Sequence, residues 1–206
     1  AKQNNRESLF SGMRSRETFG TSGPYIEPRF FAGWNLPEDI CRTNSFLKRS
    51  YAGGVPMGSI IKNIEGKTSS PVFVASAVRD PSEDSTPLQK LQIIKGWIDV
   101  QGNAHQRIFD VAGGGMNATV DRTNCSQSGT GYNQLCTTWT DPDFSPDVSG
   151  VYYLRVLENP SCRWSQFDCL ALDPKTRPKT CSDPSIPSII QERAWTSPIW
   201  YYSKNE

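Results

Sequence analysis

The sequence predicts a mainly β protein: an antiparallel β-sandwich-like domain with long loops and one short N-terminal helix. Three observations lead to this fold class. The 206 residues include 16 Gly and 15 Pro, and 11% are aromatic, which is typical of chains with many short strands and turns. Long helical patterns are missing, and several short segments instead follow a period of two. The segments do not alternate strand with helix, so we expect the strands to pair antiparallel.

The one helix is expected over residues 4–16. Asn4 can cap its start, and Glu7 follows three residues later, which is similar to a capping box. Gly12 weakens the helix, so we expect it to depend on packing against something else. The apolar side chains that would make this contact share one face of the helix: Leu9, Phe10 and Met13.

Two strands are expected next. Residues 25–34 alternate, and one of their faces is nearly all apolar. Pro28 interrupts this face and cannot donate a ladder hydrogen bond, which favours an edge strand or a bulge. Residues 71–78 (PVFVASAV) are apolar on both faces, which predicts a buried central strand.

A hairpin is expected from residues 91–100 and 105–111, because Gln101-Gly102-Asn103 between them is a turn signal. Two further strands are expected over residues 150–157 and 194–202. The intervening segments are polar or rich in Gly and Pro, and we expect them to be loops: 35–70, 112–136 and 158–188.

Charge and composition exclude several function classes. The chain has 22 Lys+Arg against 21 Asp+Glu, a net charge of +1, which gives no electrostatic case for nucleic acid. It has no apolar run long enough to span a membrane. Its single histidine, His105, cannot build a multi-histidine metal centre. Because no nucleophile elbow such as G-x-S-x-G accompanies it, we interpret His105 as structural or surface, and we predict no catalytic residue and no cofactor for this chain.

The six cysteines are expected to form disulfides, which predicts an oxidising compartment, periplasmic or secreted. They lie in loop-like segments without the tight C-x₂₋₄-C spacing of zinc sites; free thiols and a metal site are the alternatives. Sequence cannot fix the pairing, and the best single guess is Cys125–Cys136, which flanks a polar loop. We expect at least two disulfides among Cys41, Cys125, Cys136, Cys162, Cys169 and Cys181.

Two other groups of side chains deserve a functional hypothesis beside an ordinary one. Asp141, Asp143 and Asp147 lie within seven residues and could offer oxygens to Ca²⁺, but they lack the EF-hand Gly and Glu. Asp-Pro pairs are ordinary turn formers, which is the interpretation we favour. Four C-terminal aromatic residues could form a sugar-stacking platform, although such residues more often pack in a core: Trp195, Trp200, Tyr201 and Tyr202.

Several long blocks resemble, in order, the DUF3604 family of uncharacterised bacterial proteins, and they span almost the whole chain. They are SRETFGTSGPYIEPRFFAGW (15–34), GVPMGS (54–59), LQIIKGWIDVQG (91–102), FDVAGGG (109–115), TTWTDPDFSPD (137–147), YYLRVLENPSCRW (152–164) and IQERAWTSPIWY (190–201).

The resemblance implies a relation to PHP-type metal-dependent hydrolases, similar to the CehA/McbA metallohydrolases. Members of the family are longer and carry their His and Asp metal ligands upstream, and none of these ligands maps onto this chain. The resemblance therefore implies that residues 1–20 are the last helix and crossover of an upstream barrel, which would hold a divalent metal. Residues 21–206 would be the C-terminal β domain. We accordingly expect the chain, which begins with Ala1, to be processed, truncated or cut from something larger.

The function expected from the resemblance is that of an accessory domain, not catalytic by itself, which packs on the catalytic barrel and shapes its substrate mouth. Two alternatives stay open. The chain could be a stand-alone secreted binding module for a glycan or a protein, or one part of an enzyme that is nicked or encoded as two chains. Without an upstream partner, the apolar helix face predicts self-association through Leu9, Phe10 and Met13.

Overall fold

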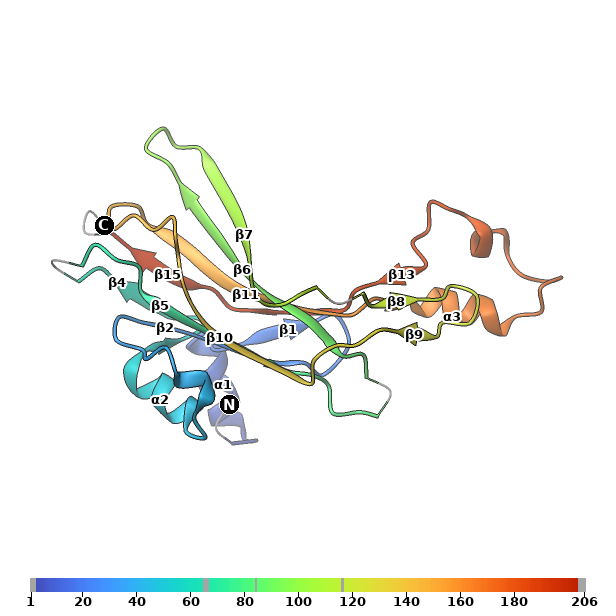
Figure 1. Ribbon diagram of the computed structural model, residues 1–206, viewed down its shortest axis with the longest axis horizontal. Coiled ribbons are helices and arrows are strands. Elements are labelled where there is room, and N and C mark those ends of the chain that lie inside the picture. Colours follow the sequence, from blue (N-terminus) through green and yellow to red (C-terminus); the bar gives the residue numbers. More distant parts are fainter. Residues whose placement is uncertain (1–2, 65–66, 84, 116, 204–206) are drawn as a thin grey trace.

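The computed structural model describes residues 3–64, 67–83, 85–115 and 117–203, and it confirms the mainly β fold (Figure 1). Two mainly antiparallel sheets pack face to face. Their inner faces meet in one apolar core, with Phe30 and Phe73 from the smaller sheet against Tyr152 and Leu154 from the larger one.

The larger sheet is built around β11. One edge of β11 pairs with β6 along its length, and the other edge pairs first with β15 and then with β14. The segment expected as one final strand is thus two, because Pro198 between them cannot donate a ladder hydrogen bond. The strands of this sheet are β1 (Phe19–Thr21), β4 (Ile60–Lys62), β6 (Leu88–Ile98), β7 (Ala104–Gly113), β11 (Gly150–Glu158), β14 (Arg193–Thr196) and β15 (Ile199–Tyr202).

The smaller sheet confirms the buried central strand. In it β5 (Val72–Val78) lies between β10 (Gln134–Thr140) and β2 (Glu27–Gly33), and the short β3 (Val55–Pro56) pairs with β2. Pro28 of β2 lies where only β5 pairs with the strand, in agreement with the expected edge position. The whole of β10 lies outside the strands we expected, so it was missed.

The outer face of the smaller sheet is covered by two elements within the expected loop 35–70. They are η1 (Ile40–Arg42) and α2 (Phe46–Gly53), and beneath them Phe31 and Val74 are buried in a second apolar cluster. The expectation of a loop was therefore wrong here. The local sequence hardly indicates a helix, and α2 is stabilised instead by burying Phe31 on the outer face of the sheet.

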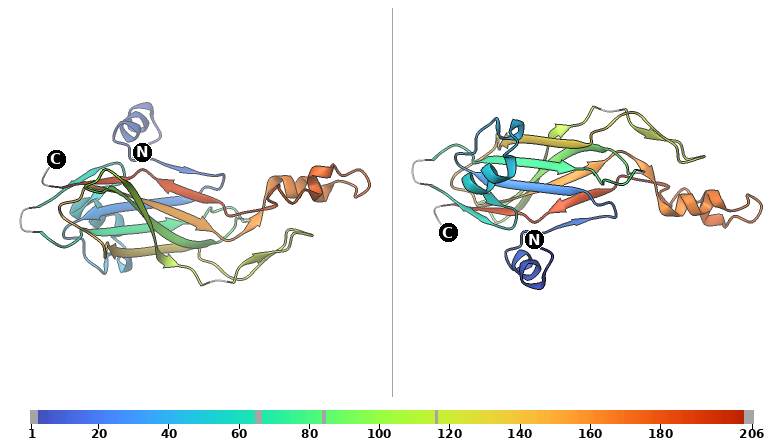
Figure 2. Two further views of the ribbon diagram at one scale, coloured as in Figure 1. Left: turned by 90° about the horizontal axis from the view of Figure 1, so that it is seen from above. Right: turned by 90° about the horizontal axis from the view of Figure 1, so that it is seen from below.

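The N-terminal helix α1 (Arg6–Arg14) is shorter than expected, and its N-cap lies one residue later than the predicted one. Asn5, not Asn4, is the N-cap, and its Oδ1 accepts a hydrogen bond from the Ser8 amide at 2.8 Å. The helix lies outside both sheets (Figure 2).

An arm projects from one end of the sandwich (Figures 1 and 2). We use this name for residues 117–130 and 159–190. Residues 158–188, expected to be irregular, in fact include a helix. The arm contains β8 (Thr119–Val120), β9 (Gln127–Ser128), β12 (Ser161–Cys162), α3 (Trp164–Ala171), η2 (Lys179–Ser182) and β13 (Ile189–Ile190).

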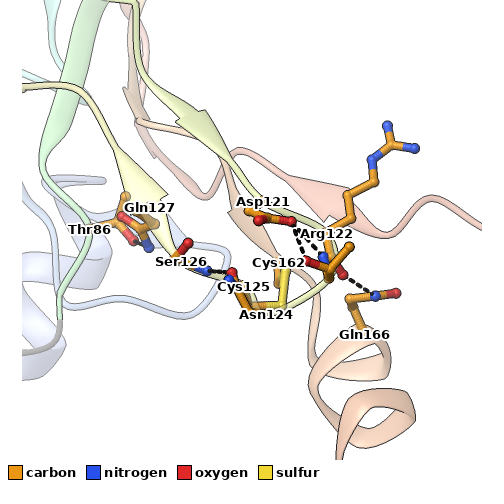
Figure 3. Close-up of a disulfide and its surroundings, with 10 residues drawn as sticks. Thr86, Asp121, Arg122, Asn124, Cys125, Ser126, Gln127, Cys162 and Gln166 are labelled. Atoms are coloured by element: carbon orange, nitrogen blue, oxygen red, sulfur yellow. Dashed lines mark hydrogen bonds between the residues drawn. A yellow bond between two sulfur atoms is a disulfide. The ribbon is translucent and has the colours of Figure 1, made fainter. Parts of the chain in front are cut away.

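Three disulfides confirm the prediction of at least two: Cys41–Cys136, Cys125–Cys162 and Cys169–Cys181. The guess Cys125–Cys136 was wrong. The β8–β9 hairpin carries Cys125 out to the arm, where it bonds to Cys162 (Figure 3). Cys136 lies in β10, which reaches η1, and so it bonds to Cys41.

Candidate functional site

An open hollow of about 760 Å³ lies beside the end of the β6–β7 hairpin, and we call it the hairpin hollow. Gly96 and Gly150 are among the residues that line it. Its apolar wall is formed by Trp97 of β6 together with Trp200 and Tyr202 of β15. The hollow is thus an open concave surface with several aromatic residues in its lining.

The single histidine fixes one side of this hollow. His105 Nε2 lies 2.7 Å from Asp99 Oδ2, and its ring stacks on Trp97 with the ring centroids 5.2 Å apart. Asp99 also accepts hydrogen bonds from the backbone amides of Gln101 and Asn103. The bond to His105 and these further donors hold the pKa of Asp99 well below its usual range. His105 therefore closes the hairpin turn, which is a structural role on a partly exposed surface.

A buried ion pair ties the two sheets together near the hollow. Lys95 Nζ of β6 lies 2.5 Å from Asp141 Oδ2, just after β10, and the hydroxyl of Tyr152 in β11 donates to the same oxygen at 2.7 Å. The other oxygen of Asp141 accepts from the Asp143 amide at 2.9 Å. Burial and the charge of Asp141 raise the pKa of Tyr152 far above its usual range. Every oxygen of this buried carboxylate is hydrogen-bonded.

The three aspartates of the candidate calcium loop have separate environments. Asp141 is buried with Lys95, Asp143 pairs with Arg107, and Asp147 lines the hairpin hollow. Burial, with a smaller contribution from Asp147, raises the pKa of Tyr201 to about 12. Among the residues that the structure describes, no group of three or more His, Cys, Asp or Glu side chains is arranged to hold a metal ion. The calcium alternative stays a prediction that this geometry does not favour.

The C-terminal aromatic residues divide between the two environments that we considered. Tyr201 is buried in the core and also belongs to the lining of the hollow, which Trp200 and Tyr202 line with more exposed side chains. Trp195 is partly exposed on β14 and does not line it. The sequence reasoning missed Trp97, which the observed register places opposite His105.

The second notable surface is the apolar face of α1. The side chains of Leu9, Phe10 and Met13 are 47%, 58% and 62% exposed. The end of the helix is nevertheless held in place, because Arg16 Nε donates to the Gly58 carbonyl at 2.9 Å and the guanidinium lies over the ring of Trp200. The apolar face is therefore fixed in position and open to solvent.

The fold and these surfaces define a disulfide-bonded β-sandwich with an aromatic hollow and an uncovered amphipathic helix. A family model described as a protein of unknown function, DUF3604, matches residues 1–203. The chain belongs to the DUF3604 family, as its sequence blocks indicated. No curated protein matches it significantly. None of the helices in the described part of the chain is long and apolar enough to cross a bilayer.

Proposed function

We propose that the chain is the accessory β domain of a larger DUF3604 protein, in which it packs on a PHP-like metal-dependent hydrolase barrel and shapes the substrate mouth. The observation that carries this proposal is the exposed apolar face of α1. Burying each of its three large side chains would contribute about 1.5–3 kcal/mol, and contiguous exposed apolar patches mark interaction sites. A partner outside the described residues supplies that burial.

In this proposal the chain has two parts. Residues 1–20 form the last helix and the crossover from the barrel, and residues 21–206 form the β domain. The catalytic divalent metal belongs to the upstream domain, which is in keeping with the separate partners of Asp141, Asp143 and Asp147 here. Three disulfides are consistent with an extracellular or periplasmic location, so we place the whole protein in the periplasm or outside the cell.

The test compares the parent protein with this chain. Gene context and the intact mass of the natural product first establish whether an upstream segment with His and Asp metal ligands belongs to the same polypeptide. The double variant Leu9→Glu with Phe10→Ser is then made in both forms. It should lower the thermal stability of the parent and leave that of the isolated chain nearly unchanged. Val100→Ser is the matched control, because Val100 is 90% exposed and lies far from α1 in the sequence.

Two results would contradict the accessory role. One is a natural product that contains no upstream metal-binding segment. The other is unfolding of the isolated chain when residues 1–17 are removed, because the helix would then belong to the core of the sandwich. Concentration-dependent sedimentation of the isolated chain, abolished by the same double variant, would instead identify a second copy as the partner of α1.

The alternative, a stand-alone module that binds a glycan, is favoured by the hairpin hollow. Aromatic faces that line an open hollow suit stacking against sugar rings, and Trp97, Trp200 and Tyr202 provide such faces. A glycan array followed by titration would test this hypothesis. Trp200→Ala should then weaken binding, while Trp195→Ala, outside the hollow, should not. A chain that binds no glycan would leave the accessory role as the proposal.

A further inference from the structure

A second concavity lies where the arm leaves the sandwich, and we call it the joint cavity. Its volume is about 350 Å³. The sandwich contributes three carboxylates to its lining: Asp80 after β5, Glu158 at the end of β11, and Glu192 before β14. The arm contributes Trp164 and Phe167 of α3. Acidic groups and aromatic residues thus line one small cavity.

Glu158 is the unusual member of this group. The residue is only 2% exposed, and its Oε1 has no hydrogen-bond partner among the residues that the structure describes. Burial, reinforced by the charges of Glu192 and Asp80, raises the pKa of Glu158 to about 8. A buried oxygen without a partner is costly in free energy, and this cost falls if a ligand supplies the missing donor.

The neighbouring side chains Asp80 and Arg79 do not supply a hydrogen-bond donor to Glu158 Oε1. Asp80 has its own donors, since it accepts from the Ser82 amide and hydroxyl and from the Tyr25 amide. These bonds hold the pKa of Asp80 below its usual range, so it stays an anion. Arg79 is the cation whose charge acts to lower the pKa of Glu158. Its guanidinium, however, donates its hydrogen bonds to Ser85 and Asn133.

Glu192 adds a second carboxylate that is already oriented. Its Oε2 accepts a hydrogen bond from the Ser22 hydroxyl. The Ser22 oxygen in turn accepts from the Arg193 amide at 2.8 Å. The joint cavity therefore holds two carboxyl groups with hydrogen-bond donors, Asp80 and Glu192, and one, Glu158, with a buried oxygen that lacks a partner among the described residues.

The aromatic wall is exposed and fixed in place. The residues Trp164 and Phe167 are 83% and 48% exposed. The disulfide Cys125–Cys162 joins the β8–β9 hairpin to the start of α3, and Gln166 Nε2 donates to the Arg122 carbonyl (Figure 3). On the sandwich side, Gln127 Nε2 donates to Thr86 Oγ1 (Figure 3). The arm thus holds aromatic surface beside the acidic lining without covering it.

We propose that the joint cavity binds an organic cation, an ammonium or guanidinium group, with Glu158 as its principal acceptor. Carboxylates and an aromatic face together recognise such groups by charge-assisted hydrogen bonds and cation–π contact. On binding, Glu158 releases its proton to solvent and its carboxylate accepts a hydrogen bond from the cation; no covalent bond changes. A basic side chain of a partner protein and a free amine share this chemistry. A metal ion is not favoured, because the described residues offer no metal-binding group of three such side chains.

The experiment is calorimetric titration of the full chain with defined probes. Nα-acetyl-lysine methylamide and Nα-acetyl-arginine methylamide represent a basic side chain, and putrescine represents a free amine. Nα-acetyl-norleucine methylamide and CaCl₂ are the neutral and metal comparisons. Titration at pH 7 in buffers of different ionisation enthalpy counts the protons released. We expect binding of at least one organic cation, release of close to one proton, and affinity that rises between about pH 6 and 8.5 as Glu158 ionises.

Two variants test the roles of the lining residues. Glu158→Gln preserves the shape of the protonated acid but cannot become an anion, so binding should weaken about tenfold or more and proton release should vanish. Trp164→Ala should weaken binding a few-fold. Glu38→Gln, an exposed carboxylate outside the cavity, is the matched control and should bind as the unaltered chain does.

The outcomes that overturn the proposal are distinct. Absence of binding by every organic cation, equal binding by Glu158→Gln, or binding of Ca²⁺ in preference to the organic cations would each do so. Preference for the two blocked amino acids over putrescine would identify a protein side chain as the source of the cation. The reverse preference would identify a free amine.

Discussion

A buried carboxyl group lies beside each end of β11. One has all its hydrogen-bond partners within the chain, and the other does not, which suggests a structural role for the first and a binding role for the second. Near the start of the strand, Asp141 is fully buried and accepts hydrogen bonds from Lys95, Tyr152 and the Asp143 amide. At the other end, Glu158 is equally buried but has an unpartnered oxygen and carboxylates for neighbours.

The difference follows from which elements surround each end. At the hairpin end, β6 places a lysine on the inner side of the larger sheet, and this cation joins β6 to the loop after β10. At the arm end, the segments after β5 and before β14 supply Asp80 and Glu192 instead. The first arrangement is complete within the chain, whereas the second is completed by protonation or by a cation from outside.

The largest expected effect comes from breaking the buried Lys95–Asp141 ion pair at the hairpin end of β11. Lys95→Met should destabilise the chain by about 3–5 kcal/mol, because it leaves Asp141 charged and buried without its cation. Urea unfolding followed by tryptophan fluorescence measures this loss. The double variant Lys95→Met with Asp141→Leu should recover much of it, because removing both charges also removes the desolvation cost. A single variant that loses under about 1 kcal/mol would show that the pair is not truly buried.

Glu158, at the arm end of β11, should instead control the pH dependence of stability. The pKa of Glu158 is raised to about 8 in the folded chain, whereas the unfolded value is near the usual one. Its contribution is therefore fully present below about pH 4.5 and is lost as pH rises toward 8. Glu158→Gln should remove this loss and be more stable than the unaltered chain by about 2–4 kcal/mol above pH 8. The melting temperature of both proteins from pH 4 to 9 tests this, and parallel curves would contradict it.

The period-two pattern carried most of the sheet prediction. Apolar patterning located β5 and β11, which bury side chains on both faces or at alternate positions. The β6–β7 hairpin was located by its turn signal, because β7 is largely exposed. The apolar pattern missed β10 (Gln134–Thr140) because three of its seven residues are threonines, which weaken the apolar alternation. It missed α2 because that helix begins without a side-chain cap and ends among glycines, so its stability comes from covering Phe31.

The candidate sites were less predictable, because they depend on contacts between distant segments. The pairing of Cys125 with Cys162 depends on the β8–β9 hairpin extending along the arm. The spacing of the cysteines in the sequence does not reveal that direction. Glu158 did leave a signal in the sequence. It continues the alternation of Tyr152, Leu154 and Val156, all of which are buried, so the period of two places an acidic side chain on the core face. The expected strand 150–157 stopped one residue too early to include it.

The disulfides offer a smaller test of how independent the arm is. Replacing Cys125 and Cys162 together by Ser should cost about 2–4 kcal/mol, because this bond closes a loop that contains β10 and β11. Replacing Cys169 and Cys181 should change the unfolding of the sandwich by under about 1 kcal/mol, because α3 has no buried residue and can loosen alone. Chemical denaturation combined with amide exchange across residues 164–182 distinguishes the two. Equal losses would show that the arm and the sandwich unfold together.

The smallest expected effect concerns a third carboxylate, Asp99, which lies at the hairpin turn and has many donors. Its lowered pKa means that its stabilising bonds are present above the usual pKa and are lost only as pH falls through the folded value. Asp99→Ala should therefore increase amide exchange at Asn103 and loosen His105 without a resolvable change in global unfolding, because the turn is on the surface. Asp99→Asn retains an acceptor oxygen and should protect the Asn103 amide more than Asp99→Ala does. Unchanged exchange in both variants would show that the backbone alone holds the turn. Exchange that rises only in Asp99→Ala would show that an acceptor at this position is sufficient, in contrast to Glu158, where we expect the charge itself to matter.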